Sequence, residues 1–377
     1  MIFYQGLLFF YIMGLLLIPA IVLGVMEKPL RRYGFFATVV MLVCVFWSSG
    51  QLIALAVFCI WQTALCMILP RIKLRTRPML WLFVMLSLIP LAAAKLGAVI
   101  TLPGFAALLG ISYMTFRAIQ VIIDIHDGRI TKLRLLDLSY FLLFFPSVSA
   151  GPIDRYRRFY DDISRILTRG EYIDMLKRGV WKLMHGSFAC IVLSGLISLL
   201  WLDKLPASGV MQTVSYMYGY TFYLFFNFAG YSSMAIGTAY ILGIKLPENF
   251  NMPFLSVDMK DFWTRWHISL SSWLRDYVYN RFVMRSLKEK WFKNPRVASY
   301  IGYIITMTAM GAWHGLTPAF LLYGFYHGLL MCINEMLDLH WKKFRKLKQK
   351  GPSQAVLVII TFHLFSFGLL IFSGRIV

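Results

Sequence analysis

The stretch that decides the fold runs from residue 297 to residue 334 and reads VASYIGYIITMTAMGAWHGLTPAFLLYGFYHGLLMCIN. It contains no Asp, Glu, Lys or Arg. Because one membrane span needs roughly 20 apolar residues, this stretch predicts two consecutive spans. His314 closes the first of them, within GAWHG at residues 311–315. An ionisable side chain at membrane depth is costly and therefore indicates a functional site.

The composition of the whole chain is typical of a multi-pass membrane protein. Of its 377 residues, 59% are apolar and 15% are charged, whereas soluble domains carry about 25% charged residues. Long apolar runs lie at residues 4–25, 35–47, 52–69, 78–96, 179–202, 210–228, 300–316, 319–337 and 355–372, and shorter ones at 105–123 and 135–150. The predicted fold class is all-α, with roughly ten or eleven membrane helices. The runs are continuous, which excludes the alternating pattern of a membrane β-barrel.

The net charge of +21 has a simple explanation in a membrane protein. In a soluble protein it would suggest nucleic acid, but here the positive-inside rule accounts for it, and no nucleic-acid partner is expected. The basic clusters are Lys28, Arg31 and Arg32, then Arg71, Lys73, Arg75 and Arg77, and later Lys342, Lys343, Arg345, Lys346, Lys348 and Lys350. With the uncharged turn at 48–51, they predict an N-terminus outside, cytoplasmic basic loops and Val377 outside. The first apolar run is too long for a signal-peptide core, so we expect it to be retained.

The simplest organisation is one integral membrane domain over residues 1–377, because no long linker or repeat is evident. Residues 135–150 are too short to cross comfortably and end in a loop that reads PSVSAGP at 146–152. This predicts a re-entrant or broken helix, buried in the protein or lining a wet cavity. All five cysteines lie in apolar runs without metal-ligand spacing: Cys44, Cys59, Cys66, Cys190 and Cys332. They predict packing residues, with no disulfide and no metal site.

A second histidine, His267, lies in DFWTRWHISL at residues 261–270. The pattern from 258 to 285 predicts one helix, on which Asp261 and Arg265 are four residues apart and can pair. His267, Ser271 and Arg275 would share another face. The apolar side chains of this predicted helix are Trp263, Trp266, Leu270, Trp273, Leu274 and Tyr277. The helix is too polar to span and too aromatic to be fully solvated, so residues 245–296 are expected at the cytoplasmic interface, partly within the protein.

Neutral histidine accepts a proton near pH 7, which suits a general base. The glycines on either side of Trp313-His314 would let backbone or substrate approach closely. Alternatively, His314 is a neutral imidazole bonded to a carbonyl, and His267 pairs with Asp261 or Arg275. The other histidines are expected at packing, interface or span-flanking positions: His126, His185, His327, His340 and His363. No GxSxG, GxGxxG or P-loop motif appears, so a protein nucleophile is not indicated. A histidine base could still activate a hydroxyl group against a thioester.

Residues 279–296 read YNRFVMRSLKEKWFKNPR and contain six basic residues and one acid. The plainest interpretation is an inside-positive face next to the membrane. The sharper interpretation is a docking site for an acidic protein, with exposed apolar residues as the anchor.

Four spaced motifs together resemble the membrane-bound O-acyltransferase family over nearly the whole chain. They are FAGYSSMAIG at 228–237, NMPF at 251–254, DFWTRWHISLSSWLRDY at 261–277 and WHG at 313–315. The short length and the GPI loop at 151–153 resemble the branch that transfers D-alanine in teichoic-acid D-alanylation. The polysaccharide O-acetyltransferase branch usually has a Gly-Gly-Asn-Arg segment after the Tyr-Val-Tyr region. Here NRFVMR follows at 280–285.

The resemblance implies a ring of tilted helices around a thinned centre, with a funnel outside and a narrow tunnel to the cytoplasm. It implies His314 as the catalytic residue and His267 as its companion near the inner tunnel mouth. Their neighbours Trp313, Arg265 and Ser269 are expected to bind substrate.

The donor implied by the family is D-alanine, held as a thioester on the phosphopantetheine arm of a small acidic carrier protein. No permanently bound cofactor is expected. The carrier would dock at Phe282, Val283, Met284, Arg285 and Lys288. The acceptor would be an outer hydroxyl group that leads to teichoic acid, directly or through an intermediate protein, at a Gram-positive plasma membrane.

Three other functions remain open on the sequence. An O-acetyltransferase of the same family would modify an exported polysaccharide. A proton-coupled transporter would need acidic residues inside its spans, and Asp124 is the clearest of the few available. A scaffold would leave the burial of His314 unexplained.

Overall fold

The computed structural model describes residues 6–47, 50–72, 76–96, 108–206, 209–349 and 351–376. These residues are mainly helical and form no strand beyond one isolated antiparallel bridge, between Phe250 and Trp266. The predicted all-α class is confirmed. The expectations for residues 48–49, Lys73, Arg75, Lys350 and Val377 lie outside the described residues.

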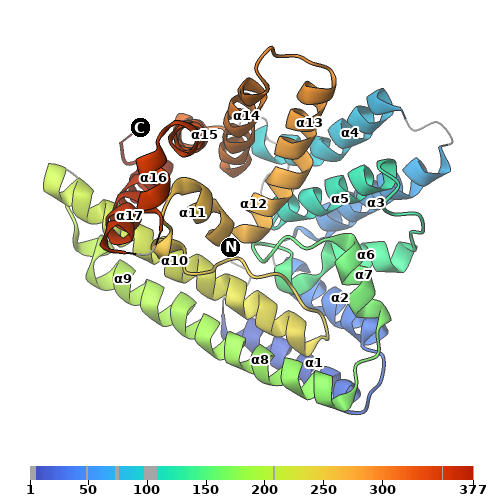
Figure 1. Ribbon diagram of the computed structural model, residues 1–377. Helices are drawn as coiled ribbons and strands as arrows, with labels where there is room; N and C mark the ends of the chain where they lie inside the picture. Colours follow the sequence, from blue (N-terminus) through green and yellow to red (C-terminus); the bar gives the residue numbers. More distant parts are fainter. Residues whose placement is uncertain are drawn as a thin grey trace. The chain divides into compact units, whose positions relative to one another are not determined.

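The chain packs as two compact units, one of Met1–Ser187 with Tyr231–Pro247 and one of Phe188–Gly230 with Glu248–Val377. The helices of the first unit are α1 (Leu7–Val25), α2 (Arg31–Trp47), α3 (Leu52–Ile68), α4 (Arg77–Leu96), α5 (Ile111–His126), α6 (Leu135–Leu143), α7 (Tyr156–Ser164) and α8 (Arg169–Ser187) (Figure 1). Those of the second are α9 (Ser194–Leu200), α11 (Met259–Arg265), α12 (Ile268–Leu274), α13 (Asn280–Lys288), α14 (Pro295–His314), α15 (Pro318–His340), α16 (Lys342–Leu347) and α17 (Pro352–Phe372). Helix α10 (Val210–Ile241) contributes to both. A single integral domain stays a prediction.

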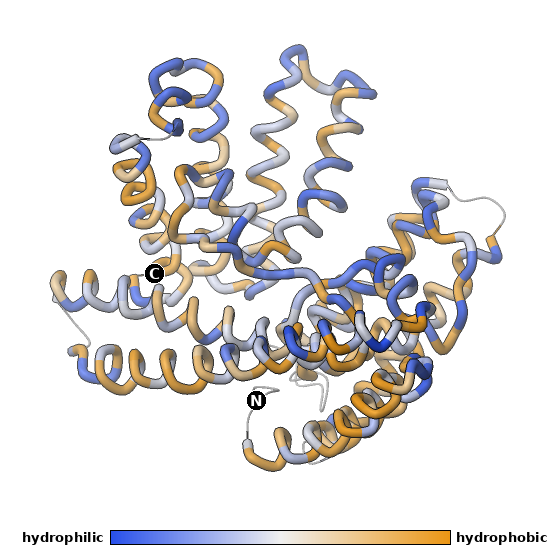
Figure 2. The backbone as a smooth tube through the Cα atoms, turned by 60° about the horizontal axis from the view of Figure 1, so that its bottom comes forward, coloured by the Kyte–Doolittle hydropathy of each residue, from blue (hydrophilic) through white to orange (hydrophobic). Residues whose placement is uncertain are grey.

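Six described helical segments are long and apolar enough to cross a membrane: Leu7–Val25, Leu52–Arg71, Arg77–Lys95, Arg169–Lys204, Pro318–His340 and Pro352–Phe372. The other predicted runs are helical as well where they are described, in α2, α5, α6, α10 and α14. Hydrophobic residues line most helices, whereas hydrophilic ones gather mainly at helix ends and connections (Figure 2). On α1, Leu7 is 91% exposed and Leu8 is 70% exposed. Such surfaces are stable in lipid, where apolar side chains need no cover.

In the first unit, the prediction of a broken helix at 135–150 is confirmed. Helix α6 gives way to a short 3₁₀ turn at Phe145–Ser147, and extended chain follows. The buried guanidinium of Arg117 on α5 donates to the carbonyl oxygens of Phe141 at 3.0 Å and Ser147 at 2.6 Å. These bonds satisfy carbonyl groups that the interrupted helix leaves open, which lets irregular backbone lie inside the protein.

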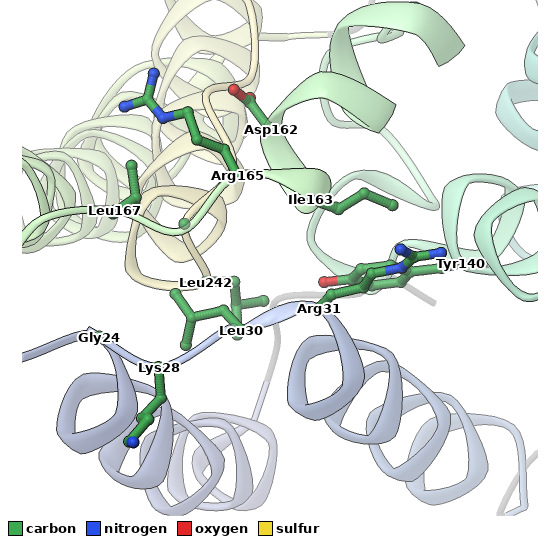
Figure 3. A pocket seen from close by; sticks show the side chains of 11 residues that line it. Gly24, Lys28, Leu30, Arg31, Tyr140, Asp162, Ile163, Arg165, Leu167 and Leu242 are labelled. Carbon is green, nitrogen blue, oxygen red and sulfur yellow. The ribbon is translucent and has the colours of Figure 1, made fainter. Parts of the chain in front are cut away.

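A small cavity in the first unit lies where the α1–α2 connection meets the end of α7. Arg31 and Tyr140 lie side by side on one part of its lining, and Asp162 and Arg165 form another (Figure 3). The cavity has a volume of about 10 Å³, which is room for about one water molecule. It is therefore too small for an acyl donor.

In the second unit, α14 and α15 form a hairpin that packs backbone against backbone (Figure 1). A Cβ atom added at Gly324 would lie 2.9 Å from the Cα of Thr308, and one at Gly328 would lie 3.0 Å from the Cα of Ile304. Small residues at such positions allow membrane helices to approach closely. Helix α17 packs on α15, where the Tyr326 hydroxyl donates to a carbonyl oxygen of α17 at 2.9 Å. The end of α14, the start of α15 and the end of α17 therefore meet.

Candidate active site

The predicted single helix over 258–285 is wrong, because the chain breaks at Trp266 and His267. Trp266 has extended backbone and pairs with Phe250, and His267 adopts the left-handed conformation with φ 45° and ψ 49°. Helix α11 ends before this break and α12 begins after it. A π-helical turn at Arg275–Tyr279 then leads into α13. A left-handed histidine is uncommon and marks a locally constrained backbone.

Asn249 holds the break from the side. Its backbone carbonyl oxygen accepts from the N–H of Ile268 at 3.0 Å, and its side-chain oxygen accepts from the N–H of Ser269 at 3.2 Å and from the Ser269 hydroxyl at 2.6 Å. On the other side of His267, the N–H of Asn251 donates to the carbonyl oxygen of Arg265 at 2.9 Å. These bonds give partners to the N–H groups of Asn251, Ile268 and Ser269 where the break removes the helical bonds.

The His267 side chain is buried and faces aromatic rings. Its ring lies edge-to-face against Phe228, with centroids 4.7 Å apart, and 6.2 Å from the ring of Trp313. Its Nε2 has no hydrogen-bond partner within the described part of the chain. Burial, and then the positive charge of a protonated His314, lowers the pKa of His267 well below its ordinary value of 6.5. His267 is therefore neutral at pH 7.

His314 is the last residue of α14, as the sequence predicted. Its half-buried ring lies 4.9 Å from that of Phe372 on α17 and 6.2 Å from that of Phe320 on α15. Gly315 follows with extended backbone, and Pro318 is the first residue of α15. Proline suits a first helical position because its missing N–H is not needed there.

The two histidines, 47 residues apart in the sequence, are brought to the same end of α14. The Trp313 ring is close to both, with its centre 6.2 Å from that of His267 and 4.5 Å from that of His314. His267 thus lies beside the last turn of α14. The segment that follows it runs back along α14, since Tyr279 stacks on Tyr303 at 4.7 Å. The structure thus gives His267 the neighbour Trp313, and its expected place near the inner tunnel mouth stays a prediction.

Arg265 and Ser269, expected to bind substrate, both take part in local structure. The predicted ion pair is confirmed, because Arg265 Nε donates to Asp261 Oδ1 at 2.7 Å. The Asp261 carboxylate also accepts from the N–H of Val257 at 3.2 Å. Ser269 is buried and bonded to Asn249. Substrate binding by Trp313, Arg265 and Ser269 stays a prediction.

The predicted docking residues lie on two sides of α13. Met284 is 66% exposed, and Arg285 and Lys288 are also exposed. Phe282 and Val283 are half-buried, and a Cβ at Gly302 of α14 would lie 3.0 Å from Cγ2 of Val283. Two further apolar residues are exposed after Met284, Leu287 on α13 and Trp291 three residues beyond its end. We call Met284, Leu287 and Trp291, with Arg285 and Lys288, the α13 face.

Several residues around the histidines carried no signal in the sequence. Asn249 belongs to none of the motifs or apolar runs, and Phe320, Tyr323 and Phe372 are apolar residues of the runs at 319–337 and 355–372. Nothing in their spacing relates them to His314, because they come together only when three helix ends pack. His327, predicted as a packing or interface residue, is fully buried with its ring 4.6 Å from that of Tyr323.

All five cysteines are free thiols, and Cys44 is exposed. Within the described ranges, no group of three or more His, Cys, Asp or Glu side chains could hold a metal ion.

A multi-pass helical protein with two neighbouring histidines at the end of an apolar hairpin has the features of a membrane enzyme. The membrane-bound O-acyltransferase family model matches residues 123–374, and the chain belongs to this family. The match includes both histidines, and the protein is an acyltransferase.

Three relatives show how far the similarity extends. The chain is 40% identical to the teichoic acid D-alanyltransferase of Bacillus subtilis (strain 168), over 99% of this chain and 98% of that protein. It is 35% identical to the enzyme of the same name from Streptococcus thermophilus, over 98% of this chain and 94% of that protein. It is 31% identical to a probable alginate O-acetylase of Pseudomonas syringae pv. tomato, over 71% of this chain and 50% of that protein.

Proposed function

We propose that the protein transfers D-alanine from the phosphopantetheine thioester of an acidic carrier protein to a hydroxyl acceptor that leads to teichoic acid. Similarity to two teichoic acid D-alanyltransferases over almost the whole chain supports the substrate class. The observation that carries the mechanism is the meeting of His267, Trp313 and His314 at one end of α14.

In the proposed reaction, the neutral imidazole of His314 takes the proton of the acceptor hydroxyl group. The hydroxyl oxygen attacks the thioester carbonyl carbon, a C–O bond forms and the C–S bond breaks. The leaving thiolate then receives the proton from His314, so the products are a D-alanyl ester and a free thiol. His267 stays neutral because its pKa is low, so no second cation opposes the charge that forms on His314. A general base of this kind contributes roughly 10²–10⁴-fold to the rate.

The charge pattern supports a cytoplasmic donor and an outer acceptor. The basic residues before α14 and those of α16 lie next to the ends of the α14–α15 hairpin that are remote from His314. The positive-inside rule favours the cytoplasm for that end. Helix α14 has 20 residues and so is about 30 Å long, close to the thickness of the hydrocarbon core. In this proposal the N-terminus lies outside, in a Gram-positive plasma membrane.

The test is transfer of D-alanine by purified protein in vesicles, with D-alanyl carrier as donor and teichoic acid as acceptor. His314→Ala should lower the rate at least about 100-fold, because it removes the base. It should leave thermal unfolding unchanged. The matched control is His363→Ala on α17, whose exposed ring is bonded to the carbonyl of Ile359. Normal esterification by the His314 variant would contradict the proposal.

A second candidate function is O-acetyl transfer to a polysaccharide, favoured by the similarity to the probable alginate O-acetylase. That similarity covers only half of the acetylase, whereas the D-alanyltransferases match end to end. An assay with acetyl and D-alanyl donors in competition separates the two functions, and acetyl products alone would establish the second.

A further inference from the structure

The D-alanyl donor of the proposed function carries an ammonium group, and the helices around His314 offer it no carboxylate. Residues 297–334 contain no Asp or Glu, and neither do residues 339–377. These stretches include the end of α14, the start of α15 and all of the sequence from α16 onward. Because a charge in apolar surroundings needs a partner, some other group must receive the ammonium.

Aromatic rings from three helix ends surround His314. The ring of Phe372 lies 4.8 Å from that of Phe320 and 5.2 Å from that of Tyr323. The ring of Trp313 lies 4.5 Å from that of His314. Trp313, Phe320 and Phe372 are half-buried, so each keeps part of its surface accessible. We call Trp313, Phe320, Tyr323 and Phe372 the aromatic wall.

The face of an aromatic ring attracts a cation within about 6 Å of the ring centre, more strongly where water is excluded. The same unit already contains such contacts. The guanidinium of Arg375 lies 4.3 Å from the ring centre of Tyr216, and the ammonium of Lys348 lies 4.5 Å from that of Phe344. Ring faces therefore hold cations elsewhere in this unit.

We propose that the aromatic wall binds the ammonium group of the D-alanyl donor through cation–π contacts and thereby selects aminoacyl over neutral acyl donors. This rests on the proposed function and adds the group that recognises the substrate. A donor without an ammonium group gains nothing from the ring faces, so selection against neutral acyl groups follows.

The test compares two donors on the same carrier protein, the D-alanyl thioester and the D-lactyl thioester. D-lactate has a neutral hydroxyl group where D-alanine has its ammonium. In Phe372→Leu and, independently, in Phe320→Leu, the ratio of the D-alanyl rate to the D-lactyl rate should fall about tenfold. Phe372→Tyr keeps the ring and should keep the ratio. The control is Phe367→Leu, an exposed ring on the same helix that lies 5.7 Å from Tyr326.

Equal losses for both donors in the two leucine variants would overturn the proposal, since the rings would then only hold His314 in place. Unchanged rates with both donors would overturn it as well. A wild-type protein that transfers D-lactate but no D-alanine would instead refute the proposed function, and with it the aminoacyl selection.

Discussion

His267 combines burial, a left-handed backbone and a neighbouring histidine in one residue. Its type and its motif made it a candidate from the sequence alone. Its backbone conformation could not be predicted, because the bonds that impose it come from Asn249 and Phe250, well outside the local helical pattern. A neutral, firmly held imidazole next to Trp313 suits a positioning role beside the proposed base, His314.

The lowered pKa of His267 predicts how the stability of the fold depends on pH. The unfolded chain binds a proton at His267 near pH 6.5, whereas the folded protein does so only at much lower pH. The free energy of unfolding therefore has its full value above about pH 6.5 and falls as the pH decreases below it. Thermal unfolding of wild type and His267→Gln in detergent between pH 7.5 and pH 5 tests this. Wild type should lose more stability over that range, and identical pH slopes would be inconsistent with a buried neutral His267.

At the scale of elements, the break between α11 and α12 sets the position of His267. Helix propensity and the Asp261–Arg265 pair both favour a continuous helix, and the pair is present. Long-range bonds from Asn249 override the local preference at Trp266 and His267. The sequence could predict the broken helix at 135–150, because the apolar run is short, Pro146 lies within it and Gly151-Pro152 follow it, and these are local features.

Asn249→Ala tests the role of this break. It removes the acceptor of two bonds from Ser269 and should lower the free energy of unfolding by roughly 1–3 kcal/mol. The rate of transfer should fall further than this loss explains, since His267 is no longer held. The control is Asn251→Ala, because Asn251 is exposed and its backbone bond to Arg265 is kept. Chemical denaturation with equal stability for both variants would argue against the role of Asn249.

The α13 face refines the predicted docking site. The sequence identified an apolar group at 282–284 but could not tell which side of the helix faces outward. Because Val283 faces Gly302 of α14, Val283→Asp places a charge in packed surroundings. It should therefore destabilise the fold as well as weaken binding of the carrier protein.

Met284→Asp is therefore the cleaner test of docking. It should weaken carrier binding at least about tenfold, by removing an apolar anchor and adding a charge that repels an acidic partner. Met252→Asp is the matched control, since Met252 is 68% exposed and lies in a loop. Binding measured in detergent that is equal for the two variants would remove α13 from the docking surface.

For the molecule as a whole, the sequence predicted the membrane class and the two consecutive apolar helices over residues 297–334. It also identified His267 and His314 as candidate site residues. It could not predict that the histidines share one end of α14, since 47 residues separate them and only packing brings them together. The aromatic wall was beyond prediction for the same reason, because Phe372 reaches His314 only when α17 packs against α15.

The most direct test of acyl transfer across the membrane is the sidedness of the reaction in vesicles with oriented protein. With D-alanyl carrier supplied only on the side of the α13 face, D-alanyl ester should form on acceptor confined to the opposite side. The D-alanine ester on each side is measured by mass spectrometry. Ester formation only when carrier and acceptor share one side would contradict the account.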